Sequence, residues 1–203
     1  EFRRVLFRSD ENYIYVAVWC WDTEPDKIVA RYMRRDDRLW DDDVVSISFD
    51  TFNDLRNSYS FLINPNGTRH DAISTNNGNV NSKWDGIWEA KTQITVYGWQ
   101  VEVAFPLTTF SFDPEASQWG LNVSRRLKRL DQSGIWSSPR TSIRAYYVSE
   151  AGKLNGLSGL KQGLGLEFNP YILGKQSEDK DLGTEDFDFE WGGDFRYRIT
   201  PKM

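Results

Sequence analysis

Aspartates are concentrated around one tryptophan in residues 36–50, DDRLWDDDVVSISFD. Six of these residues are aspartate, and Trp40 stands between two clusters of them. Carboxylates at this density suit four kinds of chemistry. They can form an acid–base pair, hold a cation, accept hydrogen bonds from sugar hydroxyls, or only solvate the mouth of a β-sandwich.

Acid–base catalysis is the interpretation that the spacing supports least. The two carboxyl groups of a glycosidase lie roughly 5 to 9.5 Å apart across a cleft, and separate strands usually carry them. Asp41, Asp42 and Asp43 are consecutive, so at the entrance of a strand their side chains point alternately to opposite faces. No acid–base pair is evident, so we predict no catalytic residue and leave the question of an enzyme open.

A cation is the second alternative, at the turn DTFND, where Asp50, Asn53 and Asp54 offer oxygen ligands. Calcium takes carboxylate and amide oxygens, but no D-x-D-x-D-G loop is present. The competing interpretation is an Asx-type turn, in which these side chains accept hydrogen bonds from their own backbone. We favour the turn, and if any cofactor is present we predict a structural calcium here.

Composition excludes several classes of function. The net charge of −5 comes with both signs interspersed, which argues against a nucleic-acid partner. Cys20 is the only cysteine, so an intrachain disulfide is impossible, and its apolar strand YVAVWCWD predicts a buried thiol. His70 is the only histidine, which argues against a histidine-rich zinc site or a Ser-His-Asp triad. No apolar run reaches the length of about 18 residues that a membrane helix needs.

The two ends of the sequence suggest a fragment. Reverse-translated, EFRRVLFRS at residues 1–9 matches an in-frame reading of a common sequencing-library adapter. We therefore expect residues 1–9 to be an artefact fused at Asp10, with the native N-terminus missing. The final residues ITPKM contain no closing element, so we expect truncation there as well.

The middle of the chain reads as β-structure. From Asn12 onward apolar residues recur with a period of two, and turn signals such as NPNG and NNGN separate the runs. The predicted strands are NYIYVAVW (12–19), DVVSISFD (43–50), SYSFLIN (58–64), EAKTQITV (89–96), WQVEVAF (99–105) and WGLNVSRRL (119–127). Short helical turns are expected within residues 24–33 and 106–110, and a hairpin turn at Tyr97 and Gly98. The pattern predicts an all-β domain over residues 10–160, an antiparallel, jelly-roll-like β-sandwich.

The composition and the length of the alternating segments change at about residue 160. A glycine-rich connection at residues 156–165 precedes two long alternating segments, 166–176 and 187–199. In the second, aromatic residues occupy one face and charged residues the other, over a length that suits a tilted outer-membrane strand. We predict that residues 161–203 are a linker and the first strands of an outer-membrane β-barrel. A surface hairpin with one buried face is the alternative.

Several motifs resemble the carbohydrate-binding module family 9, in the branch that precedes outer-membrane barrels of uncharacterised function in Bacteroidota-type bacteria. They are YIYVAVWCWDTEPDKI, RRDDRLWDDDVVSISFDTFND, YSFLINPNGTRHDA, GWQVEVAFPLTTF and WGLNVSRRLKR followed by WSSPR. GLEFNPYILGKQ and FDFEWGGDFRYRITP are similar to the first strands of that barrel. The resemblance implies a β-sandwich that clamps a saccharide between two tryptophans and fixes it with charged hydrogen bonds.

Carried over residue by residue, the resemblance implies that Trp40 is the first sandwiching tryptophan and Asp43 the acidic residue that opens the next strand. Ser46 stands where sugar-binding members have a glutamate, and Leu62 where they have an arginine. Both differences remove a charge-assisted contact. For Trp40, packing in the core is the alternative.

The second tryptophan has three candidates. Trp136 is the nearest match, and Trp84 or Trp88 could substitute for it. Arg126 completes the candidate ligand site, and Asp43 is expected to turn inward and pair with Arg125 or Arg126.

The charged residues around Trp40 also have an interpretation that involves no ligand. The rim residues that we expect to solvate the loop are Asp36, Asp37, Arg38, Asp41 and Asp42. The basic residues that we expect to pair with the many aspartates are Arg125, Arg126, Lys128 and Arg129.

Three functions follow as hypotheses. The first is a non-catalytic, carbohydrate-binding-like periplasmic domain of a barrel protein in the envelope of a Gram-negative bacterium. It would capture an oligosaccharide for uptake and catabolism, with its own C-terminal barrel as partner. The second is a structural or gating domain of the barrel that has lost sugar binding, which Ser46 and Leu62 favour. The third is a fragment of a glycoside hydrolase.

Overall fold

The computed structural model describes residues 2–137, 144, 146–161, 166–179 and 184–197. The chain divides after Gln162 into two units, a β-sandwich and a β-hairpin. The expected all-β, antiparallel sandwich is confirmed, since all strand pairings in the described part are antiparallel. No helix of the described residues is long and apolar enough to cross a membrane.

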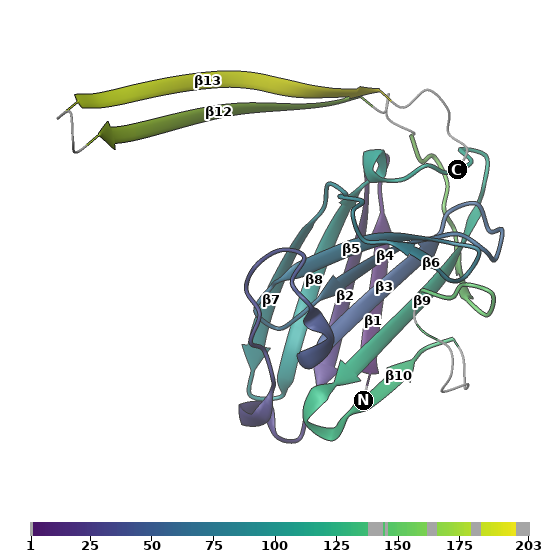
Figure 1. Ribbon diagram of the computed structural model, residues 1–203. Coiled ribbons are helices and arrows are strands. Elements are labelled where there is room, and N and C mark those ends of the chain that lie inside the picture. Colours follow the sequence, from purple (N-terminus) through teal and green to yellow (C-terminus); the bar gives the residue numbers. More distant parts are fainter. Residues whose placement is uncertain (1, 138–143, 145, 162–165, 180–183, 198–203) are drawn as a thin grey trace. The chain divides into compact units, whose positions relative to one another are not determined.

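One sheet of the sandwich has four strands in the order β1-β2-β8-β7. Its strands are β1 (Phe2–Ser9), β2 (Tyr13–Trp21), β7 (Glu89–Thr95) and β8 (Gly98–Pro106). On β2 the residues Ile14, Val16 and Val18 are buried and alternate with more exposed ones, as a strand with a single buried face requires. This sheet lies behind the other in the view of Figure 1.

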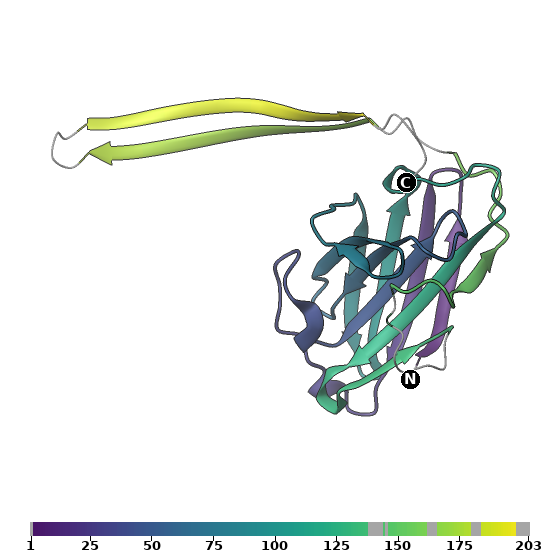
Figure 2. The ribbon, with the colours of Figure 1, turned by 45° about the vertical axis from the view of Figure 1, so that its right-hand side comes forward.

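The other sheet has the order β10-β9-β3-β4-β5-β6, and β11 shares the outer edge of β9 with β10. Its strands are β3 (Val44–Asp50), β4 (Ser58–Ile63), β5 (Arg69–Thr75), β6 (Asn79–Asn81), β9 (Gln118–Leu127), β10 (Gln132–Ile135) and β11 (Gly152–Asn155). β3 is the central strand, between β4 and β9, and every one of its residues is buried. Figure 2 shows this strand inside its sheet, beside β9.

Single 3₁₀ turns connect the strands: η1 (Pro25–Lys27), η2 (Leu39–Asp41), η3 (Leu107–Thr109) and η4 (Lys128–Leu130). η1 and η3 lie within the two segments where helical turns are expected. The hairpin turn is shifted by one residue from the prediction. Val96 and Tyr97 form it, while Gly98 begins β8 opposite Thr95.

Aromatic side chains fill the space between the sheets. Phe61 contacts Phe105 with ring centroids 4.5 Å apart, and Phe49 meets Phe105 and Phe110 edge to face at 5.3 and 5.4 Å. These arrangements are favourable for aromatic rings and supply much of the buried apolar area. Cys20 belongs to this core, as predicted, and burial raises the pKa of its thiol to about 12.

Residues 2–9, expected to be an adapter artefact, form β1 along the edge of β2. Val5 and Phe7 pack against the core opposite Val18 and Val16. Strand formation does not test where the segment comes from, so its origin stays a prediction.

Four further strands, β5, β6, β10 and β11, were not predicted from the sequence. β6, β10 and β11 have three or four residues each, too short for a period to be recognised. β5 has seven residues, but His70 and Asp71 interrupt its apolar pattern.

The second unit is a hairpin of two 14-residue strands, β12 (Leu166–Asp179) and β13 (Thr184–Tyr197). Its register places Ile172 opposite Trp191 and Phe168 opposite Phe195, so aromatic residues of both strands share one face. These four side chains are exposed in the described structure. The ring of Phe168 lies over Gly193, because a Cβ atom added at this glycine would overlap the ring.

Gly98 is required by the close approach of two strands. Its φ is +131°, and a Cβ there would overlap the carbonyl oxygen of Cys20. We expect Gly98→Ala to lower the free energy of unfolding by about 2 kcal/mol, measured by urea denaturation. Gly134→Ala is the matched control, because no atom lies within 4 Å of a Cβ at that position. Equal stability of the two variants would contradict the prediction.

Candidate functional site

A groove of about 540 Å³ lies on the face of the β3–β4–β9 sheet that points away from the core. Its lining residues come from distant parts of the sequence: Leu39, Trp40, Val44, Ser46, Ser60, Leu62, Ser124, Arg125, Arg126, Ser133, Ile135, Arg144 and Tyr146. Such a concave surface with a few polar groups is the usual setting of a small-ligand site.

Small side chains make the floor of the groove. Along β3, Val45, Ile47 and Phe49 point into the core, so Ser46 and Ser48 point to the other face. Ser46 lies opposite Leu62 on one side and opposite Ser124 on the other. The two positions at which the sequence departs from the family resemblance are therefore cross-strand neighbours, and both line the groove.

Trp40 stands at the wall of the groove because its neighbours in the chain are anchored. Leu39 is buried, and Asp42 is completely buried while it accepts hydrogen bonds from the backbone N–H of Arg31 and Tyr32, at 2.9 and 3.1 Å. Between these anchors Trp40 is 51% exposed. The alternative of core packing for Trp40 is excluded.

Asp42 and Asp43 are both fully buried, which corrects the expected aspartate rim at Asp42. Asp42 was expected to solvate the loop, but it holds the loop from inside, with a further hydrogen bond from Asn64 Nδ2 at 2.8 Å. Asp43 turns inward, as expected, and its Oδ1 accepts from the backbone N–H of Lys128 at 2.8 Å. Of the two arginines expected to pair with it, Arg126 contacts Asp131 instead. Burial raises the pKa of the Asp43 carboxyl. Asp43 is not among the groove-lining residues, so we assign it to the fold rather than to ligand contact.

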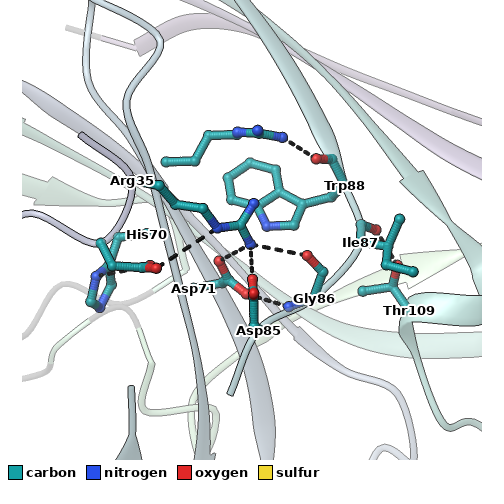
Figure 3. A network of polar contacts seen from close by, with 10 residues as sticks. Arg35, His70, Asp71, Asp85, Gly86, Ile87, Trp88 and Thr109 are labelled. Atoms are coloured by element: carbon teal, nitrogen blue, oxygen red, sulfur yellow. Dashed lines mark hydrogen bonds and ion pairs between the residues drawn. The ribbon is translucent and has the colours of Figure 1, made fainter. Parts of the chain in front are cut away.

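Figure 3 shows a polar network around Arg35, which lies at the start of the loop that carries Trp40. Arg35 donates to Asp71 Oδ1 at 2.8 Å and to the carbonyl oxygen of Gly86 at 3.0 Å, and it also pairs with Asp85. Asp71 is fully buried on β5, and its other oxygen accepts from the backbone N–H of Gly86. Burial raises the pKa of Asp71. The network ties two loops to one strand of the sheet.

The opposite side of the groove comes from the chain after β10. Ser58 on β4 donates to the carbonyl oxygen of Tyr146 at 3.0 Å, which fixes this segment over the sheet. The Tyr146 ring lines the groove and stacks on Tyr147, with centroids 4.9 Å apart. Sequence reasoning missed Tyr146, because the only local signal is a pair of tyrosines in a segment without strand alternation.

The tryptophans proposed as a second sugar platform lie elsewhere. Trp84 packs against the core rings of Tyr59 and Phe61, at 5.3 and 5.9 Å, and Trp88 is buried. Trp136 is exposed, but its ring lies over Gly152 of β11 and does not line the groove. Of the five candidate ligand residues, the groove brings together Trp40 and Arg126.

The predicted Asx-type turn is present at residues 50–57. Asp50 is buried and accepts from the backbone N–H of Asp54 and Leu55, and Asp54 accepts in turn from Arg56 and Asn57. Burial raises the pKa of Asp50. Among the described residues, no group of three or more His, Cys, Asp or Glu is placed to hold a metal. A calcium ion at Asp50, Asn53 and Asp54 stays a prediction.

The basic residues of β9 and η4 pair with aspartates, as expected. Arg126 contacts Asp131 at 2.7 Å and Lys128 contacts Asp41 at 2.8 Å. Asp22 is nearly inaccessible and receives two parallel hydrogen bonds from Arg129, at 2.6 and 2.7 Å. Burial raises the pKa of Asp22, but these hydrogen bonds and the nearby arginine charges outweigh it, so the net shift is downward.

The Asp22–Arg129 pair makes stability depend on pH. A carboxyl whose pKa is lowered by folding stabilises the protein above its unfolded value of 3.8, and this contribution is lost as the pH falls through the lower folded value. We expect Asp22→Asn to cost about 1.5 kcal/mol at neutral pH and much less at a pH below the lowered pKa of folded Asp22, in urea titrations at both pH values. Asp41→Asn, which breaks an exposed pair, is the control. A cost for Asp22→Asn that does not change with pH would refute the assignment.

The sandwich is similar to solved carbohydrate-binding structures at low sequence identity. A candidate carbohydrate-binding protein from Bacteroides uniformis superposes with a TM-score of 0.53 and 13% identity, over 70% of this chain and 72% of that one. Carbohydrate-binding modules of family 9 from Caldicellulosiruptor kristjanssonii superpose with a TM-score of 0.52 in complex with cellotriose and 0.54 in complex with glucose. They share 14% and 16% identity, over 78% of this chain and 74% and 76% of theirs. No protein-family model matches the sequence, and neither does any curated protein.

Proposed function

We propose that this protein binds a saccharide, without catalysing a reaction, in the groove on the β3–β4–β9 face. The observation that carries the proposal is the exposed Trp40 beside a floor of serines, in one groove with Tyr146 and Arg126. Sugar C–H faces stack on aromatic rings, and hydroxyl and guanidinium groups satisfy the sugar hydroxyls that binding removes from water. The solved structures with cellotriose and glucose support the proposal through their fold.

Two neighbouring residues of β10 allow a sharp test. Ser133 lines the groove, whereas Gln132 is exposed and points to the other face of the same edge strand. We would titrate a panel of neutral and charged oligosaccharides by calorimetry and tryptophan fluorescence. The proposal expects saturable binding that Ser133→Trp abolishes and Gln132→Trp preserves. A flat response from folded protein across the panel would overturn it, and would favour a structural or gating domain instead.

We further propose that β12 and β13 are the first strands of an outer-membrane β-barrel, which would place the sandwich in the periplasm. The support is the length of both strands and the exposed aromatic face formed by Phe168, Phe189, Trp191 and Phe195. Charged residues on the lipid face of such a strand are unfavourable. In a Gram-negative host, we expect the protein to fractionate with the outer membrane, Trp191→Arg to reduce that fraction, and Asp188→Arg to leave it unchanged. Recovery of the unaltered protein only in soluble fractions would overturn the proposal.

A further inference from the structure

We propose that the saccharide taken by the groove is anionic, an oligosaccharide that carries uronate carboxylates. This inference rests on the proposed saccharide binding and names the class of ligand. The family 9 structures named above are complexes with glucose and cellotriose, which are neutral sugars.

The charge of the groove has one sign. Three of the lining residues are arginines, namely Arg125, Arg126 and Arg144, and among the described residues no aspartate or glutamate lines it. A guanidinium group donates hydrogen bonds and cannot accept them. The charged contacts that the groove offers therefore suit a ligand group that only accepts.

The three arginines differ in their exposure and in the contacts that they make within the protein. Arg125 lies beneath the groove and donates to the carbonyl oxygen of Trp21 at 2.6 Å, with Asp22 at 3.6 Å. Arg126 is 32% exposed, and its partner Asp131 is 78% exposed, so that ion pair is a weak surface pair that a ligand can replace. Arg144 is exposed and forms no ion pair with any residue that the structure describes. Arg126 and Arg144 are thus the two cations that a ligand can reach.

Among the described residues, the groove offers sugar hydroxyls no carboxylate acceptor, only serine and tyrosine hydroxyls that also donate. Ser46 lies on the floor of the groove, and Ser60 already shares a hydrogen bond with Ser48 at 2.9 Å. The excess of donors favours a carboxylate, because its two oxygens accept hydrogen bonds without donating any. Among anionic groups, we favour a carboxylate because its planar shape allows two parallel hydrogen bonds from one guanidinium group. Trp40 and Tyr146 remain for the sugar ring itself.

The test compares charged and uncharged forms of one sugar. Oligosaccharides of galacturonate, glucuronate and mannuronate would each be titrated beside the same compound methyl-esterified at every carboxyl group, with sulfated and neutral oligosaccharides as further probes. We expect at least one uronate to bind about tenfold tighter than its methyl ester, a ratio that falls with added salt. Arg126→Gln and Arg144→Gln should each lower the ratio without changing Tm. Arg34→Gln, an exposed arginine outside the groove, should leave it unchanged.

Each other outcome overturns the inference in a recognisable way. Methyl esters or neutral sugars that bind as tightly as the uronates would refute the anionic preference and leave saccharide binding intact. Binding of sulfated probes alone would show that the anion is a sulfate ester and not a carboxylate. If no saccharide binds to folded protein, the proposed function and the inference fall together.

Discussion

Trp40→Ala is expected to weaken saccharide binding by about 3 kcal/mol, which is more than a hundredfold in Kd. Trp40 presents an indole ring at the groove wall, and most of the affinity of a binding site resides in a few aromatic and arginine contacts of this kind. Because Trp40 is half exposed between the buried anchors Leu39 and Asp42, its removal should change the free energy of unfolding by less than about 0.5 kcal/mol.

Calorimetry of Trp40→Ala with the best-binding member of the panel measures this effect. Trp136→Ala is the matched control, since that ring is also exposed but lies over Gly152 outside the groove. Comparable losses in the two variants, or unaltered affinity in Trp40→Ala, would remove the groove from consideration as the binding site. Loss of affinity together with a lowered Tm would instead assign Trp40 to the fold.

Asp71→Asn is expected to lower the free energy of unfolding by about 3 kcal/mol, the low end of the cost of breaking a buried ion pair. Asp71 is fully buried and receives hydrogen bonds from both Arg35 and the backbone N–H of Gly86. An asparagine has one oxygen, so its NH₂ group would face one of these two donors. The buried donor left without an acceptor adds to the loss of the charge pair.

Urea denaturation followed by tryptophan fluorescence tests this expectation, with an unchanged m-value as the sign that the unfolded state is unaltered. Asp85→Asn is the matched control, because Asp85 contacts the same guanidinium from an exposed position and should cost less than about 1 kcal/mol. Because Arg35 belongs to the loop that carries Trp40, Asp71→Asn should also weaken saccharide binding. Equal costs for the two substitutions would show that Arg35 is held by the surface pair.

Alternation along the chain was sufficient to predict most of the sandwich. The runs that became β2, β3, β4, β7, β8 and β9 were recognised because one face of each had to be apolar. Hydrogen bonds and burial could also be predicted where the partners are close in sequence. The Asx turn at Asp50 and Asp54 connects residues two to five positions apart, and the buried thiol of Cys20 follows from its own strand.

The groove could not be predicted from the sequence in the same way. A period of two predicts which residues share a face of β3, but not which distant segment covers that face. The second aromatic residue of the groove, Tyr146, is held there by a hydrogen bond from Ser58, which lies 88 positions earlier in the chain. Trp84 and Trp40 look alike in sequence, yet one packs in the core and the other is exposed.

The aspartates around Trp40 show the physical reason most directly. By itself the sequence determined that this run enters a strand, and the alternation of consecutive side chains predicted that its carboxylates do not all point to one face. Only the tertiary structure decided which of them are solvated, because burying a carboxylate is favourable only where donors from elsewhere in the chain satisfy it. Asn64 and the backbone of Arg31 supply them to Asp42, and Lys128 supplies one to Asp43, while Asp41 stays at the surface.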